Sequence, residues 1–171
     1  MARDNDEFVM IFDEIYPGLC SFLECMLGRH SVAQDVAQET FLRLYRLGLD
    51  SLPPEQARFW LFRVARNLAL NEINKTRTRQ RLWRRIEEVF QKQETNPAET
   101  LEQHEQGKKL LRLLQTLPEH QRASLLLREQ EEMSYREIAR VLETSESKVK
   151  TDIFRARCAL RAKWKEIEAA T

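Results

Sequence analysis

Apolar residues recur at intervals of three and four along most of the chain, the spacing that places them on one face of an α-helix. The pattern begins with Phe8, Ile11, Phe12 and Ile15. Only four Gly and five Pro occur among 171 residues, fewer than the turns of a sheet-rich fold would use. The sequence therefore predicts an all-α protein, and its length suits one ordinary domain or two small ones.

Helix-breaking residues divide this pattern into segments. We expect the first helix to end at Tyr16-Pro17, because proline lacks an amide donor, and a second helix to end at Gly28. A capping box at 31–34 predicts the start of a third helix. Two prolines make 48–56 a loop, after which a long fourth helix is expected from about residue 58 to residue 91.

The next segment, 92–106, is polar and acidic and contains Asn96-Pro97. We expect it to be a flexible linker between two small helical domains, at 1–91 and 107–171. Helices are expected around 107–116 and from Pro118 to about residue 131.

The pattern from Ser134 onward is typical of a helix-turn-helix. Ser134 and Glu137 form a capping box for a short helix with an apolar face at Tyr135, Ile138, Ala139 and Leu142. A polar turn at 143–146 leads to a second helix with an apolar stripe at Val149, Ile153, Ala156 and Leu160. The second helix of such a motif lies in the major groove of DNA.

The opposite face of that second helix is the candidate surface for duplex DNA. Hydroxyl and charged side chains can read base edges there while cations meet phosphates, although an ordinary amphipathic hairpin has the same pattern. The candidate contacts are Ser147, Lys148, Lys150, Thr151, Asp152 and Arg155, flanked by Arg157, Arg161 and Lys163.

The long fourth helix carries a second candidate surface. At 100° per residue its amides and cations share one arc, and amides can hydrogen-bond exposed base edges. Phe59 and Trp60 stand at the start of this helix, where they either stack on unpaired bases or belong to the core. The arc consists of Arg63, Arg66, Asn67, Leu70, Asn71, Asn74 and Arg77.

The third helix has a polar face with one exposed leucine opposite its apolar stripe. This pattern suits docking against a partner helix, and it is also typical of a solvated face. The residues on this face are Asp35, Gln38, Glu39, Leu42 and Arg46.

The net charge of +1 results from the cancellation of large opposed blocks. Residues 1–57 and 93–106 are acidic, whereas 58–92 and 107–171 are basic. Two basic surfaces separated by an acidic segment can contact two separate stretches of a polyanion, which leaves the acidic N-terminal part for a protein partner.

Neither a metal, a cofactor nor an enzymatic activity is expected. Cys20, Cys25 and Cys158 form no metal-binding pair and are expected to be reduced core thiols. The string from His104 to Lys108 lacks the second histidine of a zinc protease, and no phosphate-binding loop occurs. Since neither a signal peptide nor a membrane span is evident, we expect a cytoplasmic protein without membrane insertion.

Four segments in a fixed order extend over nearly the whole chain: QDVAQETFLRLYR at 34–46, FWLFRVARNLALN at 59–71, LPE at 117–119 and SYREIA at 134–139. In order and spacing they resemble an extracytoplasmic-function (ECF) sigma factor of the minimal kind that keeps only the second and fourth sigma domains. The resemblance implies promoter-specific initiation of transcription together with bacterial core RNA polymerase.

The resemblance also implies a role for each surface. The third helix, through Asp35, Gln38, Glu39, Leu42 and Arg46, would bind the polymerase clamp coiled coil, and the C-terminal domain would meet the flap. The loop at 48–57 would hold a flipped base of the minus-ten element, and Arg63, Arg66, Asn67, Asn71, Asn74 and Arg77 would bind the melted strand. The helix at 147–163 would read the minus-thirty-five element as duplex, and an anti-sigma factor is the further expected partner.

Two residues depart from the family's pattern. Glu143 stands near the turn where the family often has Gly, and a positive φ there would cost about 1 kcal/mol. Asp152 stands where the family has Arg, and we expect it to alter base preference, since a carboxylate can accept a hydrogen bond from cytosine. The alternative function is a helix-turn-helix regulator that acts without polymerase.

Overall fold

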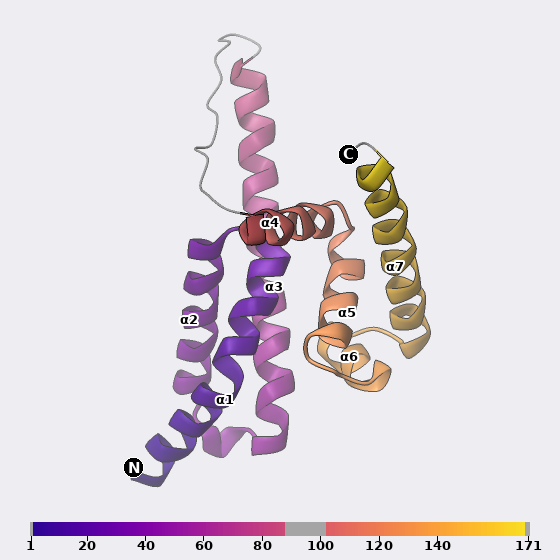
Figure 1. Cartoon of the computed structure of the whole chain (residues 1–171). Coiled ribbons are helices and arrows are strands. Elements are labelled where there is room, and N and C mark those ends of the chain that lie inside the picture. Colours follow the sequence, from indigo (N-terminus) through magenta and orange to yellow (C-terminus); the bar gives the residue numbers. More distant parts are fainter. Residues whose placement is uncertain (1, 88–101, 170–171) are drawn as a thin grey trace.

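The computed structural model describes residues 2–87 and 102–169, and within them it contains helices and no strand (Figure 1). The prediction of an all-α fold is confirmed. Among the described residues no helix is long and apolar enough to cross a membrane. The elements are α1 (Ala2–Leu27), α2 (His30–Leu47), the short 3₁₀ helix η1 (Leu49–Ser51), α3 (Pro54–Glu87), α4 (Glu102–Gln115), α5 (Glu119–Glu129), α6 (Tyr135–Leu142) and α7 (Glu146–Ala169).

The first helix does not end at Pro17, so that prediction is wrong. α1 continues through Pro17 to Leu27, and Pro17 itself is exposed. Ile15 before the proline and Leu19 after it are both buried in the same core. Packing on both sides outweighs the cost of a proline inside a helix, about 3 kcal/mol, which comes from the lost hydrogen bond and the clash of the ring with the preceding turn. Water can solvate the freed carbonyl on the outer side.

Three other helix starts differ from the sequence-based expectation. α2 begins at His30 without a side-chain cap, so the capping box predicted at 31–34 does not form. α3 begins at Pro54, since the ring of a proline in the first turn is compatible with a helix. α4 begins at Glu102, inside the segment expected to be linker, whose residues 92–101 lie outside the described part of the chain.

The first domain is a bundle of α1, α2 and α3, which pack on one another in pairs. Phe22 of α1 and Phe62 of α3 are fully buried and meet edge to face, with ring centroids 5.5 Å apart. α3 buries Leu61, Phe62, Ala65 and Ala69 along one side. Because these residues take up the inner side of α3, its amides and cations are left on the outer side.

The second domain consists of α4 to α7, with α7 packed on α5 and α6. The predicted stripe of α7 is confirmed, since Val149, Ile153 and Ala156 are buried and Leu160 is partly buried against the core. Leu127 of α5 and Ile138 of α6 complete this core.

The two domains dock through α1, which contacts α4 and α5, and through α3, which contacts α6 (Figure 1). Arg122 of α5 is buried at this junction and donates hydrogen bonds to the Met26 carbonyl at the end of α1 and to the Leu117 carbonyl. The Gln115 side chain donates to the Cys25 carbonyl at 2.8 Å. The end of α1 is therefore held by side chains of the second domain.

Replacing Arg122 tests how much this junction stabilises the chain. Arg122→Ala leaves buried carbonyls unpaired, and we expect the free energy of unfolding to fall by about 2–4 kcal/mol in urea titrations followed by circular dichroism. Arg112→Ala, which removes an exposed guanidinium of α4, is the control and should change stability by less than about 0.5 kcal/mol. Equal stabilities of the two variants would contradict the assigned role of Arg122.

Candidate nucleic-acid interface

The helix-turn-helix is built as its sequence predicts. The Ser134 hydroxyl accepts a hydrogen bond from the Glu137 amide at 3.2 Å, and the Glu137 carboxylate accepts from the Ser134 amide at 2.7 Å. The hydrogen bond that the Ser134 amide donates to the Glu137 carboxylate is the largest cause that lowers the pKa of Glu137, and the nearby Ser134 hydroxyl lowers it further. The capping box is confirmed, and it fixes where α6 starts.

The turn between α6 and α7 contains a strained residue. Glu143 follows the last residue of α6 with φ of 54° and ψ of 48°, the left-handed conformation that glycine adopts at low cost. The departure from glycine therefore affects the backbone, as the sequence indicated. The Glu143 carboxylate lies 3.7 Å from Arg63 of α3 in the other domain.

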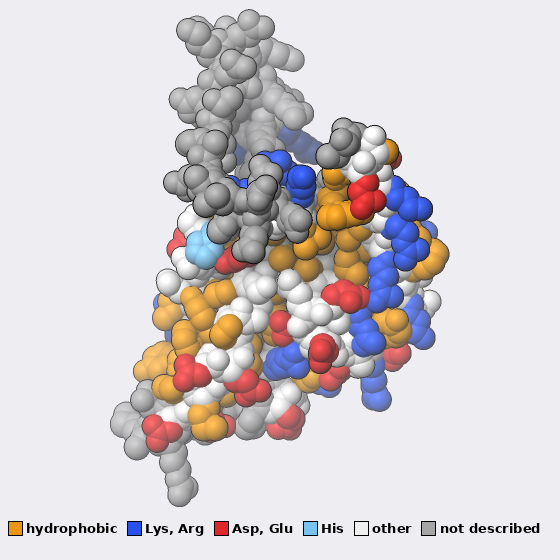
Figure 2. All heavy atoms as spheres, viewed as in Figure 1, with side chains coloured by type: hydrophobic (Ala, Val, Ile, Leu, Met, Phe, Trp, Pro, Cys, Tyr) orange, Lys and Arg blue, Asp and Glu red, His pale blue; other side chains and the backbone are white. Residues whose placement is uncertain are grey.

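The outer face of α7 carries most of the predicted duplex contacts. Ser147, Lys148, Lys150, Thr151 and Arg155 are all exposed. Lys and Arg side chains line the outer side of α7 at the right of Figure 2. Lys150 lies over the Tyr135 ring of α6, 5.6 Å from its centroid, and Arg157 pairs with Glu129 of α5.

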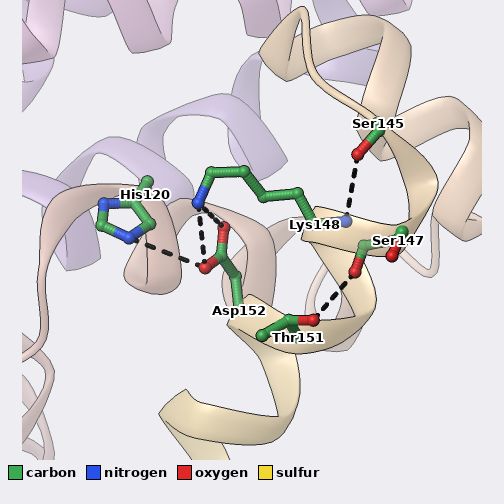
Figure 3. A network of polar contacts seen from close by, with 6 residues as sticks. All are labelled: His120, Ser145, Ser147, Lys148, Thr151 and Asp152. Atoms are coloured by element: carbon green, nitrogen blue, oxygen red, sulfur yellow. Dashed lines mark hydrogen bonds and ion pairs between the residues drawn. The ribbon is translucent and has the colours of Figure 1, made fainter.

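Asp152 is the exception, and its placement on the DNA-facing side is wrong. Its side chain is 4 % exposed, because Asp152 lies beside Val149 and Ile153 on the side of α7 that faces α5. The Lys148 ammonium lies 3.1 and 3.3 Å from its two carboxylate oxygens, and His120 of α5 lies 3.6 Å away (Figure 3). Its carboxylate therefore meets a lysine and not a base edge.

One exposed apolar residue of the α7 surface was not predicted from the sequence. Phe154 is 68 % exposed, and at 100° per residue it falls between Lys150 and Thr151 on the outer face. The signal was present in the sequence, since an aromatic residue outside the apolar stripe has to project outward. Apolar side chains in this position can contact the methyl group of thymine.

The amides and cations of α3 form the second surface. Asn67, Asn71, Asn74 and Arg77 are exposed, whereas Arg63, Arg66 and Leu70 are partly buried. Desolvation lowers the pKa of Arg66, and the nearby Glu143 carboxylate acts in the opposite direction. Arg77 pairs with Glu119 of α5. Two of the predicted strand-binding cations thus face carboxylates of the second domain.

A groove of about 1090 Å³ lies between α2 and α3. Asn71, Asn74 and Arg79 line one side of it, and Asp35 and Glu39 line the other. The groove brings the amides of the strand-binding candidate surface next to residues of the predicted partner face on α2.

The predicted partner face of α2 is largely exposed. Asp35, Gln38, Leu42 and Arg46 are in contact with solvent, and the half-exposed Glu39 carboxylate accepts a hydrogen bond from Arg43 at 2.8 Å. Leu42 is not the lone exposed apolar residue there, because Tyr45, which at 100° per residue lies beside Gln38, is exposed as well. Leu47 of α2 and Val9 and Met10 of α1 are further exposed apolar residues of these two helices. Figure 2 shows apolar side chains gathered at the lower left of the molecule, where α1 and α2 lie. The partner face is therefore more apolar than the sequence indicated.

Phe59 and Trp60 are both partly buried and pack against the core, as the core interpretation predicts. The Arg140 guanidinium of α6 lies 5.3 Å from the centroid of the Phe59 ring. Cys20 and Cys25 are partly buried, but Cys158 is exposed, so its assignment as a core thiol is wrong. Among the residues that the structure describes, no group of three or more His, Cys, Asp or Glu side chains could hold a metal ion.

Replacing Glu143 by glycine tests how much the left-handed backbone at this position destabilises the fold. Glu143→Gly removes the left-handed strain and loses one exposed ion pair, so we expect a net gain of about 0.5–1 kcal/mol in the free energy of unfolding. Urea titration measures the change, and Glu146→Gly, which places glycine in the first turn of α7, is the control and should destabilise. A destabilised Glu143→Gly would show that the ion pair outweighs the strain.

Comparison with known proteins gives consistent matches. The family model for sigma-70 region 2 matches residues 11–79, and the model for sigma-70 region 4 matches 107–160. The ECF RNA polymerase sigma factor SigM of Bacillus subtilis is 32 % identical over 158 residues, covering 90 % of this chain and 94 % of that protein. The ECF RNA polymerase sigma-E factor of Escherichia coli is 35 % identical over 135 residues, covering 74 % and 70 %.

Two solved structures share the fold. One is the sigma factor RpoE in complex with the anti-sigma factor NepR from Bartonella quintana, with a TM-score of 0.70, 23 % identity and coverage of 92 % of this chain and 96 % of that one. The other is CnrH in complex with the cytosolic domain of CnrY, with a TM-score of 0.67, 23 % identity and coverage of 93 % and 88 %. In both structures the protein of similar fold is in complex with another protein.

Proposed function

The chain belongs to the ECF sigma factors, and from this membership we propose that it binds bacterial core RNA polymerase and directs it to promoters that have two elements. Its activity is binding rather than catalysis. The first domain, 1–91, holds the melted minus-ten strand, and the second domain, 107–171, reads the minus-thirty-five element as duplex.

The outer face of α3 supports the role of the first domain. Its exposed amides, Asn67, Asn71 and Asn74, can hydrogen-bond the edges of unpaired bases, and Arg63, Arg66 and Arg77 can meet phosphates. The loop at 48–57 leads directly into α3 and would hold one flipped base. The outer face of α3 is the main support for the proposal. A regulator that binds only duplex DNA would not need asparagine side chains beside a groove.

The outer face of α7 supports the role of the second domain. Ser147, Thr151 and Arg155 project toward the major groove, and the ammonium groups of Lys148 and Lys150 reach phosphates. We add the exposed Phe154 to the proposed duplex contacts as an apolar contact and remove the buried Asp152 from them.

The partner face of α2 supports polymerase binding. Asp35, Gln38, Glu39 and Arg46 surround the exposed Leu42, and Tyr45 extends the apolar area. A helix of the polymerase clamp would cover this area with an apolar centre and a polar rim, the usual anatomy of an interface. The second domain would contact the flap, and an anti-sigma factor is the further proposed partner, as in the structure of RpoE with the anti-sigma factor NepR.

Transcription initiated by core polymerase tests the proposal. The purified chain and bacterial core RNA polymerase are incubated with a fragmented genomic template, and the 5′ ends of the transcripts are sequenced beside core alone. We expect discrete new start sites that share two upstream boxes. Asn67→Ala/Asn71→Ala should abolish initiation by preventing strand capture, and Lys148→Ala/Arg155→Ala should reduce it at least tenfold. Lys165→Ala, far along α7, is the matched control.

Unchanged transcription would contradict the proposal. If the chain still shifted duplex DNA under those conditions, the regulator that acts without polymerase would replace it. The two double variants also serve as controls for each other, because the α7 variant should keep single-strand binding and the α3 variant should keep duplex binding.

In the docked arrangement, carboxylates of the second domain occupy part of the strand-binding face. Glu119 pairs with Arg77, and Glu143 lies 3.7 Å from Arg63. A melted strand would have to replace both carboxylates with phosphates. The two ion pairs therefore compete with the strand for the same guanidinium groups.

Neutralising these carboxylates should favour the strand. Glu119→Gln/Glu143→Gln is expected to bind a single-stranded promoter oligonucleotide about threefold more tightly than the unaltered chain, measured by fluorescence anisotropy at low salt. Glu146→Gln/Glu166→Gln makes the same change of net charge on α7 and should alter affinity less. If the two double variants raised the affinity for the single strand equally, the gain would be due to net charge alone.

A further inference from the structure

A buried carboxylate lies at the start of the duplex-reading helix. Asp152 is in the second turn of α7 with a side chain that is 4 % exposed, and Lys148 closes over it from one turn before (Figure 3). The Lys148 ammonium lies within hydrogen-bond distance of both carboxylate oxygens, at 3.1 and 3.3 Å. His120, in the first turn of α5, approaches the same carboxylate at 3.6 Å. The carboxylate is thus enclosed by α5 and α7.

Helix stability does not account for this pair. Lysine placed four residues before an acidic residue is the weaker order of an i,i+4 pair, and a cation in the first turn opposes the helix dipole. Burying the carboxylate also costs desolvation energy, and the attraction of one partly exposed lysine offsets this cost only in part. A function for the fixed lysine explains the arrangement better.

The pair leaves the lysine able to act on another group. An ammonium has three donors, and two contacts to Asp152 leave at least one donor for a third partner. The Lys148 side chain is 52 % exposed, so this donor can face solvent. The Lys148 amide donates to the Ser145 hydroxyl at 3.2 Å, which fixes the backbone from which the side chain leaves (Figure 3).

We propose that Asp152 is a positioning residue for promoter binding, which holds the Lys148 ammonium at the start of α7 so that it donates to one DNA phosphate. This inference rests on the proposed function. Lysine has four rotatable bonds, and fixing them before binding lowers the entropic cost of the contact. Asp152 would then act through Lys148 and touch no part of the DNA.

Positioning and simple electrostatics predict opposite results. Removal of a negative charge close to DNA strengthens binding if only the field matters. Removal of a positioning carboxylate weakens binding, because the lysine ammonium is no longer held where it can donate to the phosphate. Asp152→Asn distinguishes the two directly, since it keeps the shape of the side chain and removes its charge.

The experiment uses the holoenzyme of core polymerase and the full chain, with a labelled promoter fragment recovered from the strongest mapped start site. Affinities are measured by fluorescence anisotropy over a series of salt concentrations for the unaltered chain, Lys148→Ala, Asp152→Asn and the double variant. We expect each single variant to bind about fivefold more weakly and to lower the salt slope by about one. The double variant should match Lys148→Ala, because Asp152 has no other route to the DNA.

The controls separate positioning from folding and from net charge. Glu166→Gln removes an exposed carboxylate of the same helix and should leave affinity unchanged. Asp152→Asn should weaken binding to a fragment with a scrambled upstream box by a similar factor, because a phosphate contact does not depend on the base sequence. Should Asp152→Asn fail to fold, as judged by its unfolding midpoint, Asp152→Glu keeps the charge, shifts the lysine by one methylene and should bind with intermediate affinity.

Tighter or unchanged binding by Asp152→Asn overturns the inference, and so does a further loss in the Lys148→Ala background. In either case the unaltered holoenzyme still binds its promoter, so the proposed function stands. A holoenzyme that starts no discrete transcripts overturns the proposed function and the role of Asp152 together.

Discussion

Burial of one apolar side on each long helix is the constraint on which the rest of this structure depends. In α3, Leu61, Phe62, Ala65 and Ala69 face the bundle, which leaves the amides and cations of the arc from 63 to 77 outside. α7 buries Val149, Ile153 and Ala156, so the groups proposed to meet duplex DNA project outward. Each nucleic-acid surface is thus the complement of a packed core, and packing alone sets its direction.

Docking of the two domains adds a second level of organisation. Arg122 donates hydrogen bonds to backbone carbonyls at the junction, where burying an unpaired carbonyl would lower the stability of the fold. The ion pairs farther along the junction are more exposed and individually weak, and they involve residues proposed to bind DNA. The end of α1 is thus held by buried contacts, while the more exposed ion pairs of Arg63 and Arg77 occupy the functional face of α3.

Local sequence signals predicted the structure correctly where neighbouring residues alone determine it. The capping box of Ser134 and Glu137 forms because both partners lie within one turn, and the left-handed conformation of Glu143 follows from the place of the turn. The local signals at Pro17 and at 31–34 predicted the wrong boundaries, because packing against other helices determined the course of α1 and the start of α2. The exposed Tyr45 and Phe154 were overlooked, although periodicity placed them outside their apolar stripes.

The sequence by itself determined the all-α fold, the helix-turn-helix, the two basic blocks and the resemblance to a family, since periodicity, caps and motif spacing are properties of neighbouring residues. Only the tertiary structure decided which polar residues of these helices reach solvent. Asp152 shows the difference: its spacing fits a polar face, but α5 with His120 packs across that part of α7. The width of a buried stripe depends on the helices that cover it, and these contacts join residues far apart in the chain.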